Sequence, residues 1–128
     1  MKEAEILEEL APVEDEMVFS KTTGSVFNGS NIHRVLISMG LPNLVMVCVM
    51  TSGCVESAAR DAEDPGCRVV VVDDACPTWS EELHRALLRV LGEVYARIKV
   101  TEEVLRDISS RLTTALNEGG ADAGAVPY

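Results

Sequence analysis

The sequence has few of the features that nucleic-acid-binding or membrane-spanning proteins need. Its 128 residues include 11 Lys and Arg against 21 Asp and Glu, a formal net charge of −10. Because phosphate groups are bound by Lys and Arg, this balance disfavours nucleic-acid and anionic-membrane partners. The longest apolar run, residues 44–50, is far shorter than the ~18 residues that span a bilayer. The first residues also lack the apolar core of a secretory signal, so we expect a cytoplasmic protein.

Cysteine and histidine are scarce, and their spacing does not suit a structural metal. There are four cysteines, at positions 48, 54, 67 and 76, with no Cys-x-x-Cys pair, and neither histidine lies near them in sequence. This pattern disfavours a zinc site. Without a secretory signal, we expect reduced thiols rather than disulfides. We interpret Cys48 and Cys67 as core residues, and we place Cys76 in a loop shaped by Pro77.

The chain has enough apolar residues to fold as a domain, since 47% are hydrophobic and 25% are charged. Strand-like and helix-like segments alternate along it. We expect strands over residues 17–19, 44–50, 67–72 and 95–100, with helices after Asn31, Val55, Ser80 and Thr101. We expect the Asn31 side chain to cap the first of these helices. Residues 44–50 are apolar at every position, which is typical of a strand buried on both faces. The alternation predicts an open, mostly parallel α/β sheet.

The expected helices each have an apolar face that could pack on this sheet. The residues proposed for these faces are Ala58, Ala59 and Ala62 in the second helix, Leu83, Leu87, Val90 and Leu91 in the third, and Val104, Leu105, Ile108 and Leu112 in the last. We predict one domain over residues 1–116, beginning with an acidic segment over residues 1–16. Residues 117–128 are rich in Gly and Ala, and we expect a flexible tail there.

Ligands of open α/β sheets bind beyond the carboxyl ends of the strands, which here selects residues 51–55 and 73–78. Cys54 follows Gly53 between an expected strand and an expected helix, a placement that resembles a nucleophile elbow. The helix N-terminus would favour the thiolate, and its free N–H groups could hold an oxyanion. The alternative is that Cys54 is a compact buried residue at a tight turn.

Residues 44–62, with Thr51-Ser52-Gly53-Cys54 at their centre, resemble the active-site cysteine region of the isochorismatase-like cysteine hydrolase family. Residues 19–21 and 25–29 are similar to the segment that carries the family's catalytic lysine. The resemblance extends over residues 14–112, and the residues around Cys54 are most similar to the N-carbamoylsarcosine amidase-like branch. The family also includes nicotinamidases, maleamate and ureidoacrylate hydrolases, and isochorismatases.

The resemblance implies a three-layer α/β/α, Rossmann-like fold and a role for each site residue. Cys54 would attack a carbonyl carbon, and Lys21 would lie beside the thiolate and stabilise it electrostatically. The oxyanion would be held by the backbone N–H groups of Met50 and Cys54, next to a cis peptide bond between Val49 and Met50. The substrate pocket would be lined by Phe27, Thr51, Ser52 and Gly53. We expect no cofactor, and we expect no metal because the metal ligands of nicotinamidases, an Asp with two His, lie in a part of the family's pattern that is not matched here.

One part of the family's pattern is not matched. The aspartate that serves the family as general base ends an N-terminal strand, and no segment here is similar to that strand. We therefore expect the chain to lack the family's first strands. Glu14, Asp15 and Glu16 precede a different expected strand, and we interpret them as a solvated acidic turn. We interpret His84 as a hydrogen-bonding residue at the edge of the core and Asp74 as a residue that holds its loop.

Three functions remain open at this point. The first is hydrolysis of a C–N bond in a small molecule through the Cys54 thiolate. The second is a repurposed or catalytically impaired member that binds a small molecule or a protein partner in the same pocket. The third is the vinyl-ether hydrolysis of isochorismatases. Because an apolar strand left at the edge of a sheet invites pairing with another chain, we also expect a homo-oligomer.

Overall fold

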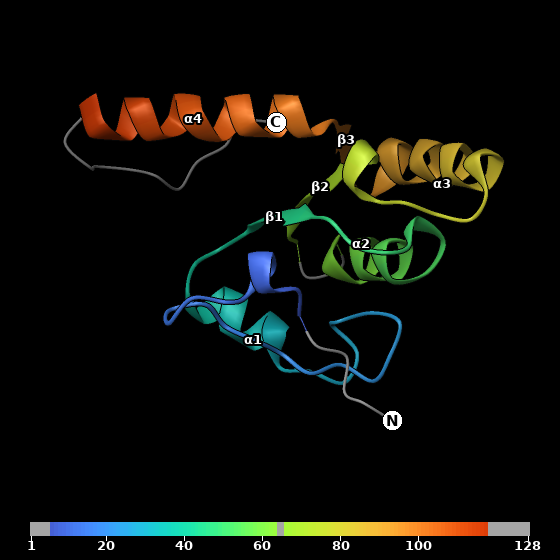
Figure 1. Cartoon of the computed structure of the whole chain (residues 1–128), viewed down its shortest axis with the longest axis horizontal. Coiled ribbons are helices and arrows are strands. Elements are labelled where there is room, and N and C mark those ends of the chain that lie inside the picture. The colour runs from blue at the N-terminus through green and yellow to red at the C-terminus, as the bar shows by residue number, and fades with distance from the viewer. Residues whose placement is uncertain (1–5, 64–65, 118–128) are drawn as a thin grey trace.

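The computed structural model describes residues 6–63 and 66–117, and its centre is a three-stranded parallel sheet (Figure 1). The strands are β1 (Asn43–Met46), β2 (Arg68–Val72) and β3 (Arg97–Lys99), in the order β1-β2-β3. Val45 lies opposite Val70, and Val71 lies opposite Ile98. The parallel pairing confirms the predicted α/β sheet.

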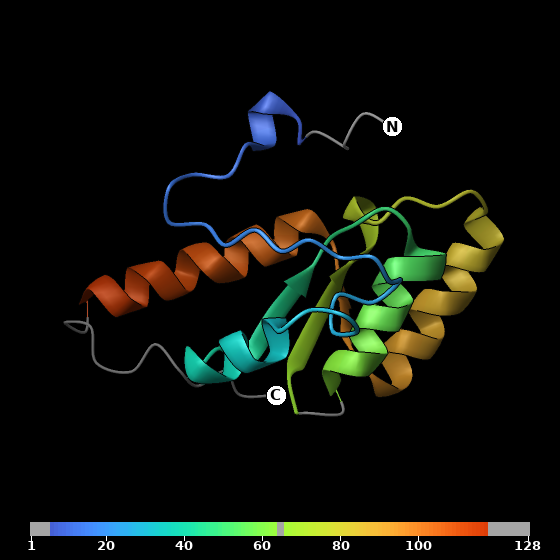
Figure 2. The ribbon, with the colours of Figure 1, turned by 90° about the horizontal axis from the view of Figure 1, so that it is seen from below.

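Helices cover both faces of the sheet. They are α1 (Ile32–Ser38), α2 (Glu56–Glu63), α3 (Glu81–Val94) and α4 (Thr101–Asn117). Figures 1 and 2 show the sheet between α4 on one side and α2 with α3 on the other, the expected three layers. The main core lies under α2 and α3, and it consists of Val55, Ala59, Ala62, Cys67, Val69, Val71, Cys76, Leu88 and Leu91. Small alanines on α2 allow this helix to approach the sheet closely, as predicted.

The first strand differs from its prediction. β1 spans only Asn43–Met46 and pairs with β2 alone, so it forms an edge of the sheet. Val45, Val47 and Val49 are 51%, 58% and 67% exposed. The prediction of a strand buried on both faces is therefore wrong, because burial alternates along β1: Leu44 and Met46 pack against the core, whereas the opposite face stays exposed. Cys48 lies beyond the end of β1 and is exposed, so its assignment to the core is also wrong.

Two expectations before β1 are also wrong. Residues 17–19 form no strand, and Met17 and Val18 are 51% and 63% exposed, because this segment pairs with none of the three strands. Asn31 precedes α1, but its side chain makes no capping hydrogen bond. Instead, the hydroxyl of Ser30 accepts a hydrogen bond from the N–H of Ile32 at 3.3 Å.

Helix α3 begins as predicted, with the Ser80 hydroxyl accepting a hydrogen bond from the N–H of Leu83 at 3.3 Å. Its predicted buried face is confirmed only in part, since Leu91 is fully buried but other members are not. His84, Leu88 and Leu91 point into the core, whereas Leu83 and Val90 are 45% and 44% exposed. The apolar pattern could not show this, since hydrogen bonds of the polar His84 help to set the rotation of the helix.

Helix α4 is anchored at its start by the loop after β2. One oxygen of Asp74 accepts hydrogen bonds from the Thr101 N–H at 2.8 Å and from its hydroxyl at 2.9 Å. These bonds hold the pKa of Asp74 below its ordinary value, and they confirm its expected structural role. Of the predicted apolar face of α4, Val104 is buried, whereas Leu105, Ile108 and Leu112 are 58%, 46% and 61% exposed. The proposed tail after Asn117 lies outside the described residues.

Within residues 6–63 and 66–117, no helix is both long enough and apolar enough to cross a membrane.

Candidate active site

The turn between β1 and α2 carries the predicted nucleophile. Residues Thr51–Val55 form one wide helical turn, in which the N–H of Val55 donates to the Met50 carbonyl at 3.3 Å. Cys54 lies on this turn and is partly exposed. The peptide bond between Val49 and Met50 is cis, as the resemblance implies. Cys54 thus lies between a strand and a helix, as the sequence predicts for a nucleophile elbow.

Lys21 lies beside Cys54, although 33 residues separate them in the chain, and its Nζ is 3.5 Å from the Cys54 Sγ. The ammonium also donates to the Thr23 carbonyl at 2.7 Å and to the Gly24 carbonyl at 3.3 Å. These two carbonyls hold the cation next to the sulfur. The structure therefore brings together the two side chains that the resemblance pairs.

The loop that carries Lys21 is attached to the nucleophile's own helix. The side-chain amide of Asn28 donates to a carboxylate oxygen of Asp61, on α2, at 2.9 Å. Within the loop, Ser25 is buried, and its hydroxyl accepts a hydrogen bond from the Phe27 N–H at 3.2 Å. These contacts position Lys21 relative to the turn, a role for Asn28 and Asp61 that sequence reasoning did not predict.

The predicted pocket residues take different positions. Phe27 packs partly buried against the core. The Ser52 hydroxyl lies 3.2 Å from that of Thr78, and the space around the Cα of Gly53 is open. The side chain of Thr51 is fully buried. Its assignment to the pocket lining is therefore corrected, because it points into the core rather than toward a substrate.

The four cysteines fall into two groups. Cys67 and Cys76 are buried, and burial raises the pKa of each thiol. Cys48 is exposed, and its Sγ lies 3.4 Å from the Val49 carbonyl. Of the two thiols that reach solvent, Cys54 alone has the Lys21 ammonium beside it. Cys48 therefore provides an internal reference for the reactivity of Cys54.

A chain of hydrogen bonds behind the turn was not predicted as a unit. Thr51 Oγ1 contacts the Cys76 carbonyl at 2.5 Å and His84 Nδ1 at 2.8 Å, and His84 Nε2 lies 2.7 Å from Asp73 Oδ1. The expectation that His84 forms hydrogen bonds at the core edge is confirmed. Asp73 at the end of a strand and His84 in the first turn of a helix were the available signals, but their spacing did not identify Thr51 as the partner.

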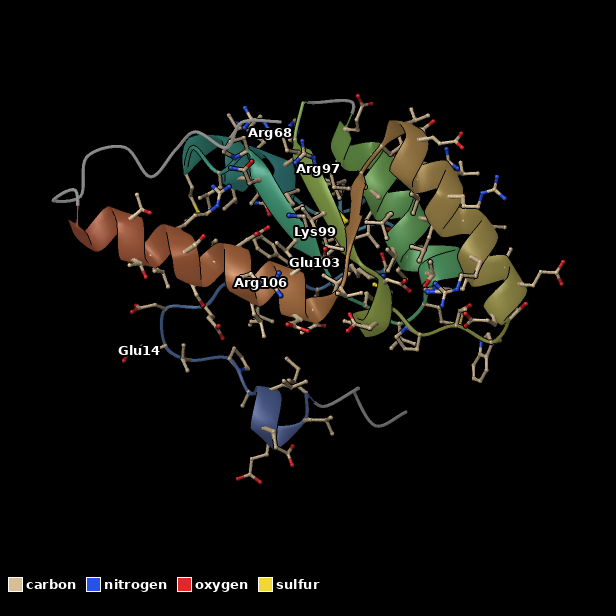
Figure 3. All side chains as sticks on the ribbon, turned by 90° about the horizontal axis from the view of Figure 1, so that it is seen from above. Glu14, Arg68, Arg97, Lys99, Glu103 and Arg106 are labelled. Atoms are coloured by element: carbon tan, nitrogen blue, oxygen red, sulfur yellow. The ribbon has the colours of Figure 1, made fainter. Side chains whose placement is uncertain are left out.

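No carboxylate of the described chain forms an ion pair with Lys21. The acidic residues before it are exposed, and Glu16 accepts a local hydrogen bond from the Val13 N–H at 3.0 Å. Figure 3 shows Glu14 on the N-terminal segment, away from the labelled strand residues.

No three His, Cys, Asp or Glu side chains of the described ranges are grouped as metal ligands. It stays a prediction that the backbone N–H groups of Met50 and Cys54 form the oxyanion hole.

Known proteins are similar to this chain in sequence and in fold. The family model for the isochorismatase domain matches residues 2–103. Nicotinamidase 3 of Arabidopsis thaliana is 36% identical over 94 residues, which cover 73% of this chain and 47% of that protein. The maleamate amidohydrolase of Pseudomonas putida is 27% identical over 105 residues, covering 82% of this chain and 49% of that protein. The chain thus spans about half the length of these two relatives.

Solved structures agree with this match. An isochorismatase-like hydrolase from Alkaliphilus metalliredigens is 26% identical, with a TM-score of 0.75 over 81% of this chain and 57% of that one. N-carbamoylsarcosine amidase from Thermoplasma acidophilum is 27% identical, with a TM-score of 0.68 over 75% of this chain and 54% of that one. With the family model covering most of its residues, the chain belongs to the isochorismatase family.

Proposed function

We propose that this chain carries the nucleophile of a hydrolase that cleaves a C–N amide bond in a small molecule. The observation that carries the proposal is the 3.5 Å contact between Lys21 Nζ and Cys54 Sγ at the carboxyl end of β1. A cation next to a sulfur stabilises the thiolate, which is the reactive form of cysteine. Relatives named nicotinamidase, maleamate amidohydrolase and ureidoacrylate amidohydrolase support an amide as the substrate class.

In the proposed reaction, the Cys54 thiolate attacks the amide carbonyl carbon and the C=O electron pair moves to oxygen. The backbone N–H groups of Met50 and Cys54 would hold this oxyanion. As the C=O bond re-forms, the C–N bond breaks, and the amine leaves with a proton. Water then attacks the thioester, releases the carboxylic acid and restores the thiol. Moving these protons is the task of a general acid and base, which typically contributes about 10²–10⁴-fold.

Replacing Lys21 with methionine is expected to slow iodoacetamide alkylation of Cys54 about tenfold at neutral pH, because the thiolate loses its cation. Intact-mass and peptide-mass kinetics measure the rate at each cysteine. Cys48, which is exposed but has no lysine beside it, should react more slowly than Cys54 in the native chain and should not respond to the substitution.

Lys99→Met is the matched control, since Lys99 pairs with Asp107 on α4 rather than with a cysteine. Its alkylation rates should equal those of the native chain. If Cys54 reacts no faster than Cys48, and Lys21→Met changes neither rate, the activated nucleophile is refuted. The alternative of a pocket that binds a small molecule without turning it over would then be favoured.

We also propose that the chain forms a homo-oligomer through the outer edge of β1. Residues 44–50 carry no charge, and Val45, Val47 and Val49 are more than half exposed, whereas natural sheet edges are usually protected by charges. Light scattering at micromolar concentration should give a mass of at least two chains, and Val47→Lys should reduce it to one. Val94→Lys, on the 65% exposed end of α3, should leave the mass unchanged. A single-chain mass for the native protein would contradict the proposal.

A further inference from the structure

Four groups behind the nucleophile turn form a continuous chain of hydrogen bonds. It starts at Asp73 after β2, passes through His84 on α3 and Thr51 in the turn, and ends at the carbonyl of Cys76. Three separate elements are thus joined at the residue that begins the turn of Cys54. His84 is only 5% exposed and Thr51 is fully buried, so water does not compete freely for these contacts.

The positions of the hydrogen atoms follow from the donor and acceptor capacities of these groups. The Thr51 hydroxyl has one hydrogen, and at 2.5 Å from the Cys76 carbonyl, which can only accept, it must point there. His84 Nδ1 therefore donates to Thr51 Oγ1 across 2.8 Å. The carboxylate of Asp73 can also only accept, so His84 Nε2 donates across 2.7 Å. In this bond pattern both ring nitrogens act as donors, Nδ1 to the Thr51 oxygen and Nε2 to the Asp73 carboxylate.

The charged groups around the ring are consistent with this pattern of donors and acceptors. Asp73 faces it from the loop after β2, and the other oxygen of Asp73 accepts from Arg85 Nη1 at 3.2 Å. Arg85 is held in turn by Glu81 at 2.7 Å, one turn earlier on α3. On the turn side the ring meets the Thr51 hydroxyl, whose own partner is the Cys76 carbonyl. A buried ring with a hydrogen-bond partner at each nitrogen is a stable arrangement, whereas a buried polar nitrogen that loses its partner is costly.

We infer that His84 is a positioning residue for the nucleophile, an inference that rests on the proposed function of Cys54. The ring does not touch Cys54. It fixes Thr51, which is also tied through its N–H to the Pro77 carbonyl at 3.4 Å, and so it sets the start of the turn that presents the sulfur. The hydrogen bond donated by Nδ1 is the one that positions the turn, because only that ring nitrogen contacts Thr51.

Two substitutions at His84 test the two ring nitrogens separately, because each keeps the hydrogen bond of only one of them. The amide nitrogen of asparagine can stand near the position of Nδ1, and that of glutamine near the position of Nε2. We expect His84→Asn to keep the bond to Thr51 and retain most of the Cys54 alkylation rate. His84→Gln keeps the bond to Asp73 but frees Thr51, and we expect it to lower that rate, and kcat on an amide substrate, about 10-fold or more with little change in KM.

The experiment measures alkylation of Cys54 in the native chain, in both His84 variants, and in Thr51→Val and Thr51→Ser, with melting curves to verify folding. Thr51→Val should resemble His84→Gln, and Thr51→Ser, which restores the hydroxyl, should recover the native rate. His33→Gln on α1 makes the same chemical change away from the turn, and we expect no effect. ¹⁵N spectra of the His84 ring should show two protonated nitrogens.

Several results would overturn the inference. They are equal alkylation rates for His84→Asn and His84→Gln, a native rate in Thr51→Val, or a ¹⁵N spectrum of a neutral ring. Because alkylation and ring protonation need no substrate, they do not depend on hydrolysis. If no amide is hydrolysed but the alkylation rates follow the expected order, the proposed reaction is rejected and the positioning role of His84 is retained.

Discussion

Replacing Cys54 with alanine is expected to lower amide hydrolysis by at least about 10³-fold, because the thioester intermediate can no longer form. The loss should appear in kcat rather than in KM, since the small methyl group leaves the surrounding contacts in place. Hydrolysis is measured as release of ammonia from nicotinamide, maleamate and ureidoacrylate, the compounds named by the relatives.

The matched control is Cys48→Ala, which removes the other exposed thiol. Its sulfur lies on the strand side of the cis peptide bond and has no lysine beside it, so we expect native turnover. If the Cys54→Ala variant still hydrolyses the amide at the native rate, another group performs the reaction. Loss of activity in both variants would instead indicate damage to the segment between β1 and α2, which carries both cysteines.

The second large effect concerns the core that supports the site. Leu91→Ala is expected to reduce the free energy of unfolding by about 3 kcal/mol, the usual cost of removing a fully buried leucine side chain. Leu91 is completely buried on α3 within the core cluster under the sheet. Urea denaturation followed by circular dichroism measures the change. Few buried residues are large in this structure, so neighbouring alanines offer little side-chain volume to fill the cavity.

Leu105→Ala is the comparison for this substitution. Leu105 lies on α4 and is 58% exposed, so its truncation should change the free energy of unfolding by less than about 0.5 kcal/mol. Equal losses for Leu91→Ala and Leu105→Ala in the monomeric Val47→Lys background would contradict the assignment of the core. That background matters because association of the chains could cover Leu105 in the native protein.

Local patterns predicted the elements whose environment is set within the chain. β2 appears where the apolar run 67–72 indicated it, and α2 buries its predicted alanines. α3 begins at its Ser80 cap. The turn with Cys54 could be located because an apolar run, a glycine and a helical pattern follow one another there. The side chain that completes the contact, Lys21, came from the family resemblance, since spacing alone does not predict a contact across 33 residues.

The wrong predictions have a common physical origin. Apolar content indicates what a segment can bury, but it does not say which neighbours are present. Residues 44–50 suit a strand covered on both faces, yet only Leu44 and Met46 pack against the core, and Val45 on the opposite face remains half exposed. In the same way, the apolar pattern of α3 placed Leu83 and Val90 inward with Leu91, whereas His84, held by its hydrogen bonds, lies inward with Leu91 instead. Thr51 lay beside the nucleophile in sequence, but its hydroxyl has its partners in the core.

The most direct test of the central claim is to trap the covalent intermediate. The native chain is mixed with each amide and quenched in acid within milliseconds to seconds, and its intact mass is measured before digestion. We expect a mass increase equal to the acyl group, located on the peptide that contains Cys54 and absent from Cys54→Ala. Amide hydrolysis that proceeds with no acyl group on Cys54, or with the adduct on Cys48, would contradict the assignment of Cys54 as the nucleophile.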